Sequence, residues 1–452
     1  MRWWFTLDNA SRVRKDRGRW QNRSRLKIGA LAGQRGQLAS CAGMHVINDG
    51  LFSGTYPLLP LVAAELGLGY AQVGAVKAAF SGASSLFQVP AGILAERVGE
   101  QLLLALGTGW VGLGLLGMAL SAGYLPLLAL SVAGGLGGNV QHPVASAVVS
   151  RAYDGGRRAT AIGTLNFAGD IGKVLAPLVV GLAAAFWGWR AGFAVLGAIG
   201  ALFALVYGLL VPEPSPTGKG ISAGSRGVST ADAGPPSTVS TASAAPTATP
   251  PQQVSRPAEN PRTTGWGITS RGAFTSLIGI GILDSAARGT ALVFIPFLLQ
   301  DKGAEAASMS FYFSVLFAAG AAGKFICGPL ADRFGSVATI AITELVTAGA
   351  LLGLLAAPLH LVLLALLPLG FMLNGTSSVL YASVAGVIDA SRRARGYGLY
   401  YTCSLLSSAA APILYGLFAD RAGLPAALVA LAAVTATIVP IVFLVRGHLN
   451  ER

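Results

Sequence analysis

The stretch Gly92-Ile-Leu-Ala-Glu-Arg-Val-Gly99 recurs as Gly328-Pro-Leu-Ala-Asp-Arg-Phe-Gly335, in a chain that is otherwise dominated by long apolar segments. Further matches stand at an offset of about 235 residues: Asp49 recurs as Asp284, Arg157 and Arg158 as Arg392 and Arg393, and Pro177 as Pro412. Charged residues and prolines seldom coincide by chance in an apolar chain. The sequence therefore predicts a duplicated membrane bundle, which is the usual build of a secondary transporter.

The composition also indicates a membrane protein. Of the 452 residues, 53% are hydrophobic and 11% are charged, whereas soluble domains carry roughly 25% charged residues. The net charge of +13 would point to nucleic acid in a soluble protein. Here the basic residues gather near the N-terminus and in alternate connections, such as those at Arg97, Arg151 and Arg333. This asymmetry predicts cytoplasmic termini, a lipid bilayer as the partner and no nucleic acid.

Twelve apolar segments are long enough to cross a bilayer. They are 38–63, 71–95, 101–121, 124–149, 160–187, 191–211, 272–299, 308–331, 337–357, 360–388, 396–419 and 424–446. Six segments per half place both halves in the same orientation, so we predict an all-α membrane protein of twelve transmembrane helices arranged as two parallel six-helix repeats.

The polar stretches divide the chain further. We predict a basic cytoplasmic arm at 1–36, an N-terminal bundle at 37–211, a disordered cytoplasmic linker at 212–265, a C-terminal bundle at 266–447 and a tail at 448–452. The linker is rich in Ser, Thr, Pro, Ala and Gly and cannot bury a core. The arm lacks the apolar stretch of a signal peptide. The three cysteines do not indicate a disulfide framework.

The six-plus-six plan, the central linker and the repeated G-x-L-A-[DE]-R-x-G loop resemble the major facilitator superfamily. The resemblance implies transport by alternating access, in which the acidic residue and the following Arg of each loop tie helix ends together across the cytoplasmic face. The implied gating residues are Gly92, Glu96, Arg97, Gly328, Asp332 and Arg333. The first loop departs from the pattern, because it has Glu96 for Asp and Glu100-Gln101 where basic residues are usual.

A finer resemblance points toward export. The stretches Gly137-Gly-Asn-Val-Gln-His-Pro143 and Asn166-Phe-Ala-Gly-Asp-Ile-Gly172 are similar to the fosmidomycin-resistance-like group of drug exporters. Gly172, Pro177 and Gly181 of the fifth span are similar to a proline-containing motif of proton-coupled antiporters, with Ala176 where Gly is usual. Small residues permit close helix contact, and Pro bends the helix.

Charged residues inside the spans are candidates for coupling, because an unpaired charge is costly in a bilayer. His45 and Asp49 lie on one helix face, as do Asp284 and Arg288, since each pair is four residues apart. As repeat equivalents, the two aspartates are expected to face each other, and the alternative is that each is locked in a permanent pair. The residues predicted to couple protons are Asp49, Asp170, Lys173 and Asp284.

Among these, Asp170 and Lys173 are the leading candidates. They lie three residues apart, and neither recurs in the second half, where Leu405 and Ser408 stand instead. A substrate or a proton could break this pair and bias which side opens. The alternative is a static buried pair.

Polar residues of other spans are predicted to line the substrate cavity. They are His45, Asn139, Gln141, His142, Asn166, Arg288, Lys324, Asn374 and Tyr381. Hydrogen bonding between neighbouring helices is the alternative for the neutral ones. Lys324 could neutralise a carboxylate or an anionic substrate, or else extend to the membrane surface. Lys77 and Glu344 are expected to reach the surface from near the ends of their spans.

Other chemistries find no support in the sequence. It has no P-loop, no H-E-x-x-H and no G-x-S-x-G motif. We therefore expect neither an enzyme nor a cofactor or metal site, but a monomeric, multi-pass transporter of the inner (plasma) membrane. Its predicted function is proton-coupled export of a small organic compound. Uptake by proton symport is the main alternative, and a non-transporting receptor or assembly factor is a remote one.

Overall fold

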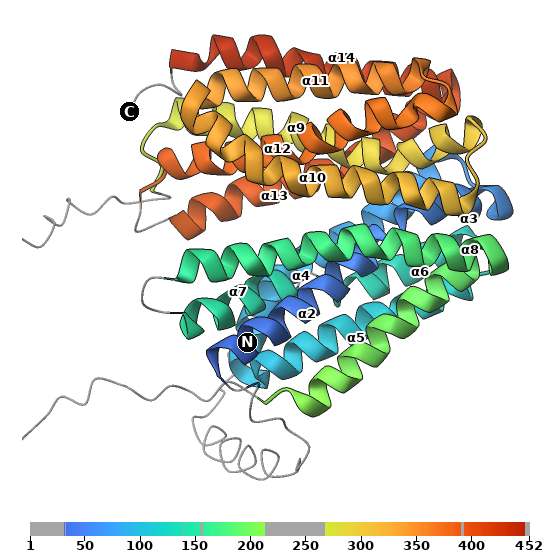
Figure 1. Ribbon diagram of the computed structural model, residues 1–452, viewed down its shortest axis with the longest axis vertical. Coiled ribbons are helices and arrows are strands. Elements are labelled where there is room, and N and C mark those ends of the chain that lie inside the picture. Colours follow the sequence, from blue (N-terminus) through green and yellow to red (C-terminus); the bar gives the residue numbers. More distant parts are fainter. Residues whose placement is uncertain are drawn as a thin grey trace, which may run out of the picture. The chain divides into compact units, whose positions relative to one another are not determined.

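Helices make up nearly all of the chain that the structure describes. The structure is a computed structural model, and it describes residues 31, 33–138, 140–153, 157–212, 267–389 and 393–447. The first half comprises α2 (Gln34–Ser53), η2 (Tyr56–Leu58), α3 (Leu59–Leu66), α4 (Tyr70–Val98), α5 (Glu100–Ala119), α6 (Tyr124–Gly135), α7 (Gln141–Ala152) and α8 (Arg158–Leu210). The second half comprises α9 (Arg271–Asp301), α10 (Ala306–Phe334), α11 (Ser336–Ala356), η3 (Leu359–Leu361), α12 (Val362–Gly386), α13 (Arg393–Ala422) and α14 (Leu424–Leu444). Figure 1 shows these halves as two groups of helices.

Helices lie at the positions of all twelve predicted spans, but two of these spans are interrupted. By length and composition, eight helices of the described residues could each cross a membrane. The first span breaks between α2 and α3 around Pro57, whose ring supplies no backbone N–H to continue the helix. The fourth span breaks between α6 and α7 in the glycine-rich stretch that contains Gly137 and Gly138. The fifth and sixth spans, which together make up α8, are separated as predicted by a kink at Gly188 with a φ of 77°, a conformation that glycine adopts without strain.

The two repeated loops form equivalent turns. Gly99 joins α4 to α5 with a φ of 105°, and Gly335 joins α10 to α11 with a φ of 85°. A positive φ favours glycine because it has no Cβ. The last glycine of each loop motif is thus explained by backbone geometry. We call the end of the bundle with these turns the loop end, and the other the opposite end.

The two halves pack together chiefly through α4 against α13 and α8 against α10. At the opposite end, the carboxylate of Asp420 on α13 accepts hydrogen bonds from the backbone N–H groups of Tyr70 (2.7 Å) and Ala71 (3.0 Å) on α4. Aromatic rings close this end as well, since Tyr56 stacks on Phe313 with centroids 6.2 Å apart. The opposite end is therefore closed by contacts between the halves.

Candidate functional site

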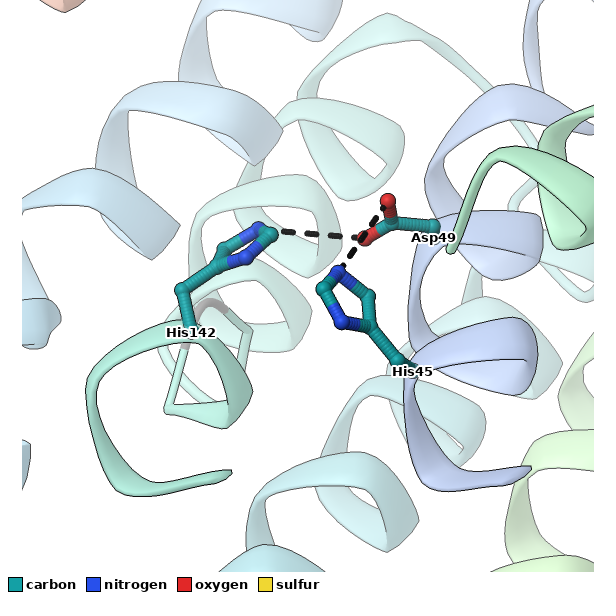
Figure 2. A group of neighbouring side chains, drawn as sticks. All are labelled: His45, Asp49 and His142. Atoms are coloured by element: carbon teal, nitrogen blue, oxygen red, sulfur yellow. Dashed lines mark ion pairs between the residues drawn. The ribbon is translucent and has the colours of Figure 1, made fainter. Parts of the chain in front are cut away.

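A cluster of charged side chains surrounds Asp49 in the first half. Asp49 of α2 is 7% exposed. Its Oδ2 atom lies 3.4 Å from Nε2 of His45, and its Oδ1 atom lies 3.7 Å from Nε2 of His142 on α7. Figure 2 shows both imidazole rings directed at the carboxylate. The predicted pairing of His45 with Asp49 is therefore present, and His142 joins it from another helix.

Lys173 and Lys324 extend this cluster across the molecule. The Nζ atom of Lys173 lies 3.0 Å from Asp49 and 3.0 Å from Asp170. The Nζ atom of Lys324, on α10 of the other half, lies 2.6 Å from Asp170. Four charged groups thus form a continuous network from α2 through α8 to α10. Of the two interpretations for Lys324, the structure favours neutralisation of a carboxylate.

The arrangement of His45, Asp49 and His142 also matches a metal-binding geometry in part. Their ligand atoms lie within 4.8 Å of one another, and tetrahedral zinc with ligands at about 2.1 Å would separate them by about 3.4 Å. However, the Lys173 ammonium contacts the same carboxylate, and its positive charge would repel a metal ion bound there. In addition, Nδ1 of His45 is buried without a hydrogen-bond partner, whereas metal-ligating histidines normally donate from the second nitrogen. The geometry therefore favours a network of side chains over a metal centre.

A second cluster lies in the other half, around Asp284. The guanidinium of Arg288 donates to Asp284 Oδ2 at 3.0 Å and to Ser285 Oγ at 3.3 Å. Glu344 of α11 is a further buried acid in this half, and its Oε1 atom has no hydrogen-bond partner among the described residues. The prediction that Glu344 reaches the membrane surface is wrong, since it is 2% exposed in the middle of α11. Its helix packs chiefly against α12 and α14.

The corresponding prediction for Lys77 is also wrong. Lys77 is 6% exposed, and its ammonium donates to the carbonyl of Phe52 at 3.1 Å and to Oγ1 of Thr55 at 2.9 Å. It also lies 3.9 Å from the ring centroid of Tyr56. The backbone break after α2 frees the Phe52 carbonyl, so Lys77 finds acceptors inside the bundle.

The Asp49 and Asp284 carboxylates each have charged partners within their own half. Asp49 is contacted from α2, α7 and α8, and Asp284 is paired within α9. Among the described residues, no ion pair or hydrogen bond connects the two clusters through these aspartates. The predicted approach of Asp49 to Asp284 across the pseudo-two-fold stays a prediction.

The predicted neutral cavity residues have mixed environments. Gln141 donates to the carbonyl of Cys41 at 3.4 Å, and Asn374 donates to the carbonyl of Gly370 in its own helix at 3.3 Å. Tyr381 packs against the ring of Tyr400. Asn166 is exposed. The contacts of Gln141 and Asn374 are those of structural residues, whereas Tyr381 belongs to the surroundings of Arg288.

The predicted gating residues lie at the loop end. Arg97, Asp332 and Arg333 are exposed, and among the described residues Asp332 forms no ion pair. Asn139 and the side-chain environments of Gly92 and Glu96 lie outside the described part, and Gly328 is half-buried. The latch between these loops therefore stays a prediction.

The glycines of the fifth span lie at close helix contacts. A Cβ on Gly172 would lie 1.9 Å from the carbonyl oxygen of Val46, and a Cβ on Gly181 would lie 2.2 Å from Ser310. Pro177 lies between them inside α8. The motif thus brings α8 against α2 in its own half and against α10 in the other half.

Comparison with known proteins identifies the class. The family model described as Major Facilitator Superfamily matches residues 41–283 and 277–451, so this chain belongs to the major facilitator superfamily.

Several curated relatives are similar over part of the chain. The fosmidomycin resistance protein of Escherichia coli is 29% identical over 34% of this chain and 37% of its own length. The uncharacterized transporter Rv1250 of Mycobacterium tuberculosis is 29% identical over 34% of this chain and 26% of its own length. The chain thus spans about a quarter to two fifths of these relatives. A D-galactonate transporter of Escherichia coli is 25% identical over 82% of this chain and 85% of its own length.

Solved structures share the fold. A bacterial homolog of the human lysosomal transporter Spinster, in an inward-facing and occupied conformation, has a TM-score of 0.74 at 17% identity and covers 91% of this chain and 96% of its own. The nucleoside transporter NupG has a TM-score of 0.71 at 12% identity, over 90% of this chain and 99% of its own.

Proposed function

We propose that this transporter works by alternating access and couples the export of a small organic compound to protons. The observation that carries the proposal is the charged network from Asp49 through Lys173 and Asp170 to Lys324, because it joins the two halves inside the membrane. The proposed proton-coupling residues of the whole transporter are Asp49, Asp170 and Lys173 of this network together with Asp284 of the other half.

The network has the properties that a coupling element requires. Its carboxylates are buried, with Asp170 5% exposed, so an unpaired charge there would be costly. Its ammonium groups are accessible, because the side chains of Lys173 and Lys324 are 30% and 32% exposed. A substrate or a proton that competes for Asp170 would loosen the link between α8 and α10 and so change the relative stability of the two open states.

The closed end is consistent with one stage of such a cycle. If the loop end lies in the cytoplasm, as the distribution of Arg and Lys predicts, the contact of Asp420 with α4 closes the outer end. The exposed Asp332 and Arg333 then belong to an open cytoplasmic end. We propose that this arrangement is inward-facing, with the gating loops apart.

The export direction is supported by two resemblances. The fosmidomycin resistance protein is similar to part of the chain, and the motif at Gly172, Pro177 and Gly181 resembles that of proton-coupled antiporters. At these glycines α8 packs closely against α2 and α10. Such packing is consistent with α8 as a helix along which the two halves move relative to each other.

Transport in reconstituted vesicles with an imposed pH gradient tests the coupling. The substrate for this assay is a compound identified by comparing the growth of cells that contain the protein with that of cells that lack it. Asp170→Asn should remove the acceleration by the gradient and retain substrate binding, whereas Asp301→Asn, which changes an exposed carboxylate at the end of α9, should leave both unchanged. If Asp170→Asn still couples fully, Asp170 is structural and the proposed role is wrong.

Uptake of an organic acid by proton symport is the second candidate. The similarity to a D-galactonate transporter covers most of the chain, and the partly exposed cations Arg288, Lys173 and Lys324 suit an anionic substrate. Cells that contain the protein should be protected from an exported toxic compound and sensitised to an imported one. In a weakly buffered solution, substrate binding should release protons from an antiporter and take up protons in a symporter.

A further inference from the structure

The ring of Tyr56 lies where the two halves meet, beside two residues that are repeat equivalents. The helices α4 and α10 are both 29 residues long, and the repeated loop motif at the end of each aligns them residue for residue. Lys77 of α4 therefore corresponds to Phe313 of α10, at the same position in its helix. The duplicated position thus carries a cation in the first half and an aromatic ring in the second.

Both residues contact the Tyr56 ring. The Nζ atom of Lys77 lies 3.9 Å from the centroid of this ring, and the ring of Phe313 stacks on it with centroids 6.2 Å apart and 19° between the planes. Phe317, about one turn further along α10, has its centroid 6.3 Å from that of Tyr56. The contact with Lys77 lies within the first half, whereas the contacts with Phe313 and Phe317 cross between the halves. Only the aromatic contacts must break when the opposite end opens.

Lys77 is a buried cation that forms no ion pair with a described carboxylate. The acceptors of its ammonium are the carbonyl of Phe52 and the hydroxyl of Thr55, which are polar but carry no charge. The ring centroid of Phe80 lies 5.6 Å from the ammonium. A cation inside a membrane protein is costly unless it is paired with an opposite charge or reached by water. The burial of Lys77 therefore opposes the closed form of this end.

We propose that Tyr56 is the plug that closes the opposite end, and that the buried charge of Lys77 favours its release. The inference rests on the alternating access of the proposed function. When α10 moves away, Phe313 and Phe317 uncover the Tyr56 ring, and water reaches the Lys77 ammonium. The aromatic contacts stabilise the closed end, whereas hydration of Lys77 stabilises the open one. Because these two contributions oppose each other, the closed end remains easy to open.

The labelling rate of Ser310→Cys measures this opening. Ser310 is 1% exposed and lies against Gly181 across the interface of α10 with α8, so a water-soluble maleimide should reach the new thiol only when this end opens. When opening and closing are fast, the labelling rate follows the fraction of open molecules. Mass spectrometry of the peptide that contains residue 310 distinguishes it from the three native cysteines. The chain with Ser310→Cys alone is the reference.

Loss of the plug should increase labelling. Tyr56→Ala and Phe313→Leu, introduced separately, should each raise the rate by about tenfold, the upper part of the range for an aromatic pair. Tyr56→Phe keeps the ring and should label at the reference rate. Because the two changes remove the same stack from different halves, the test does not depend on one variant folding well. If neither change raises the rate, Tyr56 is not the plug.

Loss of the charge should have the opposite effect. Lys77→Met should lower the labelling rate at least about fivefold, both in the reference chain and in the chain with Phe313→Leu, where labelling starts from a higher rate. Lys302→Met is the matched control, because Lys302 also donates to two backbone carbonyls, but at the end of α9 rather than beside the Tyr56 ring. It should label at the reference rate. An unchanged or faster rate in Lys77→Met would overturn the role of its charge.

The results separate this inference from the proposed function. If the reference chain is labelled and the Tyr56, Phe313 and Lys77 variants are labelled equally fast, the plug and its release are wrong, while alternating access stands. If no chain is labelled at residue 310, the opposite end does not open, and alternating access and this inference are both wrong.

Discussion

Asp420→Ala should open the end of the transporter that the structure shows closed. Asp420 lies in the last turn of α13 and accepts hydrogen bonds from the first two N–H groups of α4, Tyr70 at 2.7 Å and Ala71 at 3.0 Å. These N–H groups have no partner within their own helix, because the first turn of a helix leaves its donors free. Asp420 is therefore both the cap of α4 and a tie between the two halves.

The size of the effect follows from these two bonds. Replacing an acidic cap by alanine costs about 0.5–2 kcal/mol, and a hydrogen bond to a charged group contributes about 1.5–3 kcal/mol. Because both bonds are exposed to solvent, we take the lower part of these ranges, about 1–2 kcal/mol in total. Since 1.4 kcal/mol is a factor of ten, the closed end should open roughly 5 to 30 times more often.

Hydrogen–deuterium exchange of peptides that cover residues 69–75 measures this opening directly. In the wild type the amides of Tyr70 and Ala71 are bonded to the carboxylate and should exchange slowly. In Asp420→Ala they should exchange faster by the factor given above, while peptides from α11 keep their wild-type rate. Asp301→Asn is the control at the same end. Unchanged exchange at residues 69–75 in Asp420→Ala would refute the proposed tie.

Two further substitutions test the packing of the membrane interior. Gly172→Ala should lower the midpoint of thermal unfolding by the equivalent of about 1–3 kcal/mol, because the added Cβ would lie 1.9 Å from the carbonyl oxygen of Val46. Gly163→Ala is the control and should be neutral, because its added Cβ would meet nothing within 4 Å. Equal midpoints for the two variants would contradict the close contact at Gly172. Lys77→Met should leave the midpoint unchanged or raise it, because no ion pair links Lys77 to a described carboxylate and replacing buried charge by an apolar group is often neutral or stabilising. A clear fall in that midpoint would mean that the hydrogen bonds of Lys77 and its contact with the Tyr56 ring outweigh its burial.

The fold was predictable because its signals are local. Each span is a run of apolar residues long enough to cross a bilayer, and the repeated loop from Gly328 to Gly335 is read directly from the chain. The breaks were harder to predict. The turn around Pro57 and the break between α6 and α7 lie inside continuous apolar stretches, where residue composition does not distinguish a bend from a helix. The kink at Gly188, in contrast, agrees with the predicted boundary between the fifth and sixth spans.

The pairs within one helix were also predictable, because residues three or four apart share a face. Asp170 with Lys173 and Asp284 with Arg288 are both in contact as expected. Lys324 was recognised as a charge in a span, but its partner on α8 could not be identified without knowing how α10 is rotated.

The sequence by itself determined that this protein is a duplicated helical membrane protein, and which side chains carry charge inside it. Only the tertiary structure decided how those charges are grouped. Lys324 meets Asp170 because α10 packs against α8, and Asp420 meets α4 because the halves close at one end. Contacts of this kind depend on the rotation and tilt of whole helices, which follow from packing over the entire bundle and leave no signal at the residues themselves.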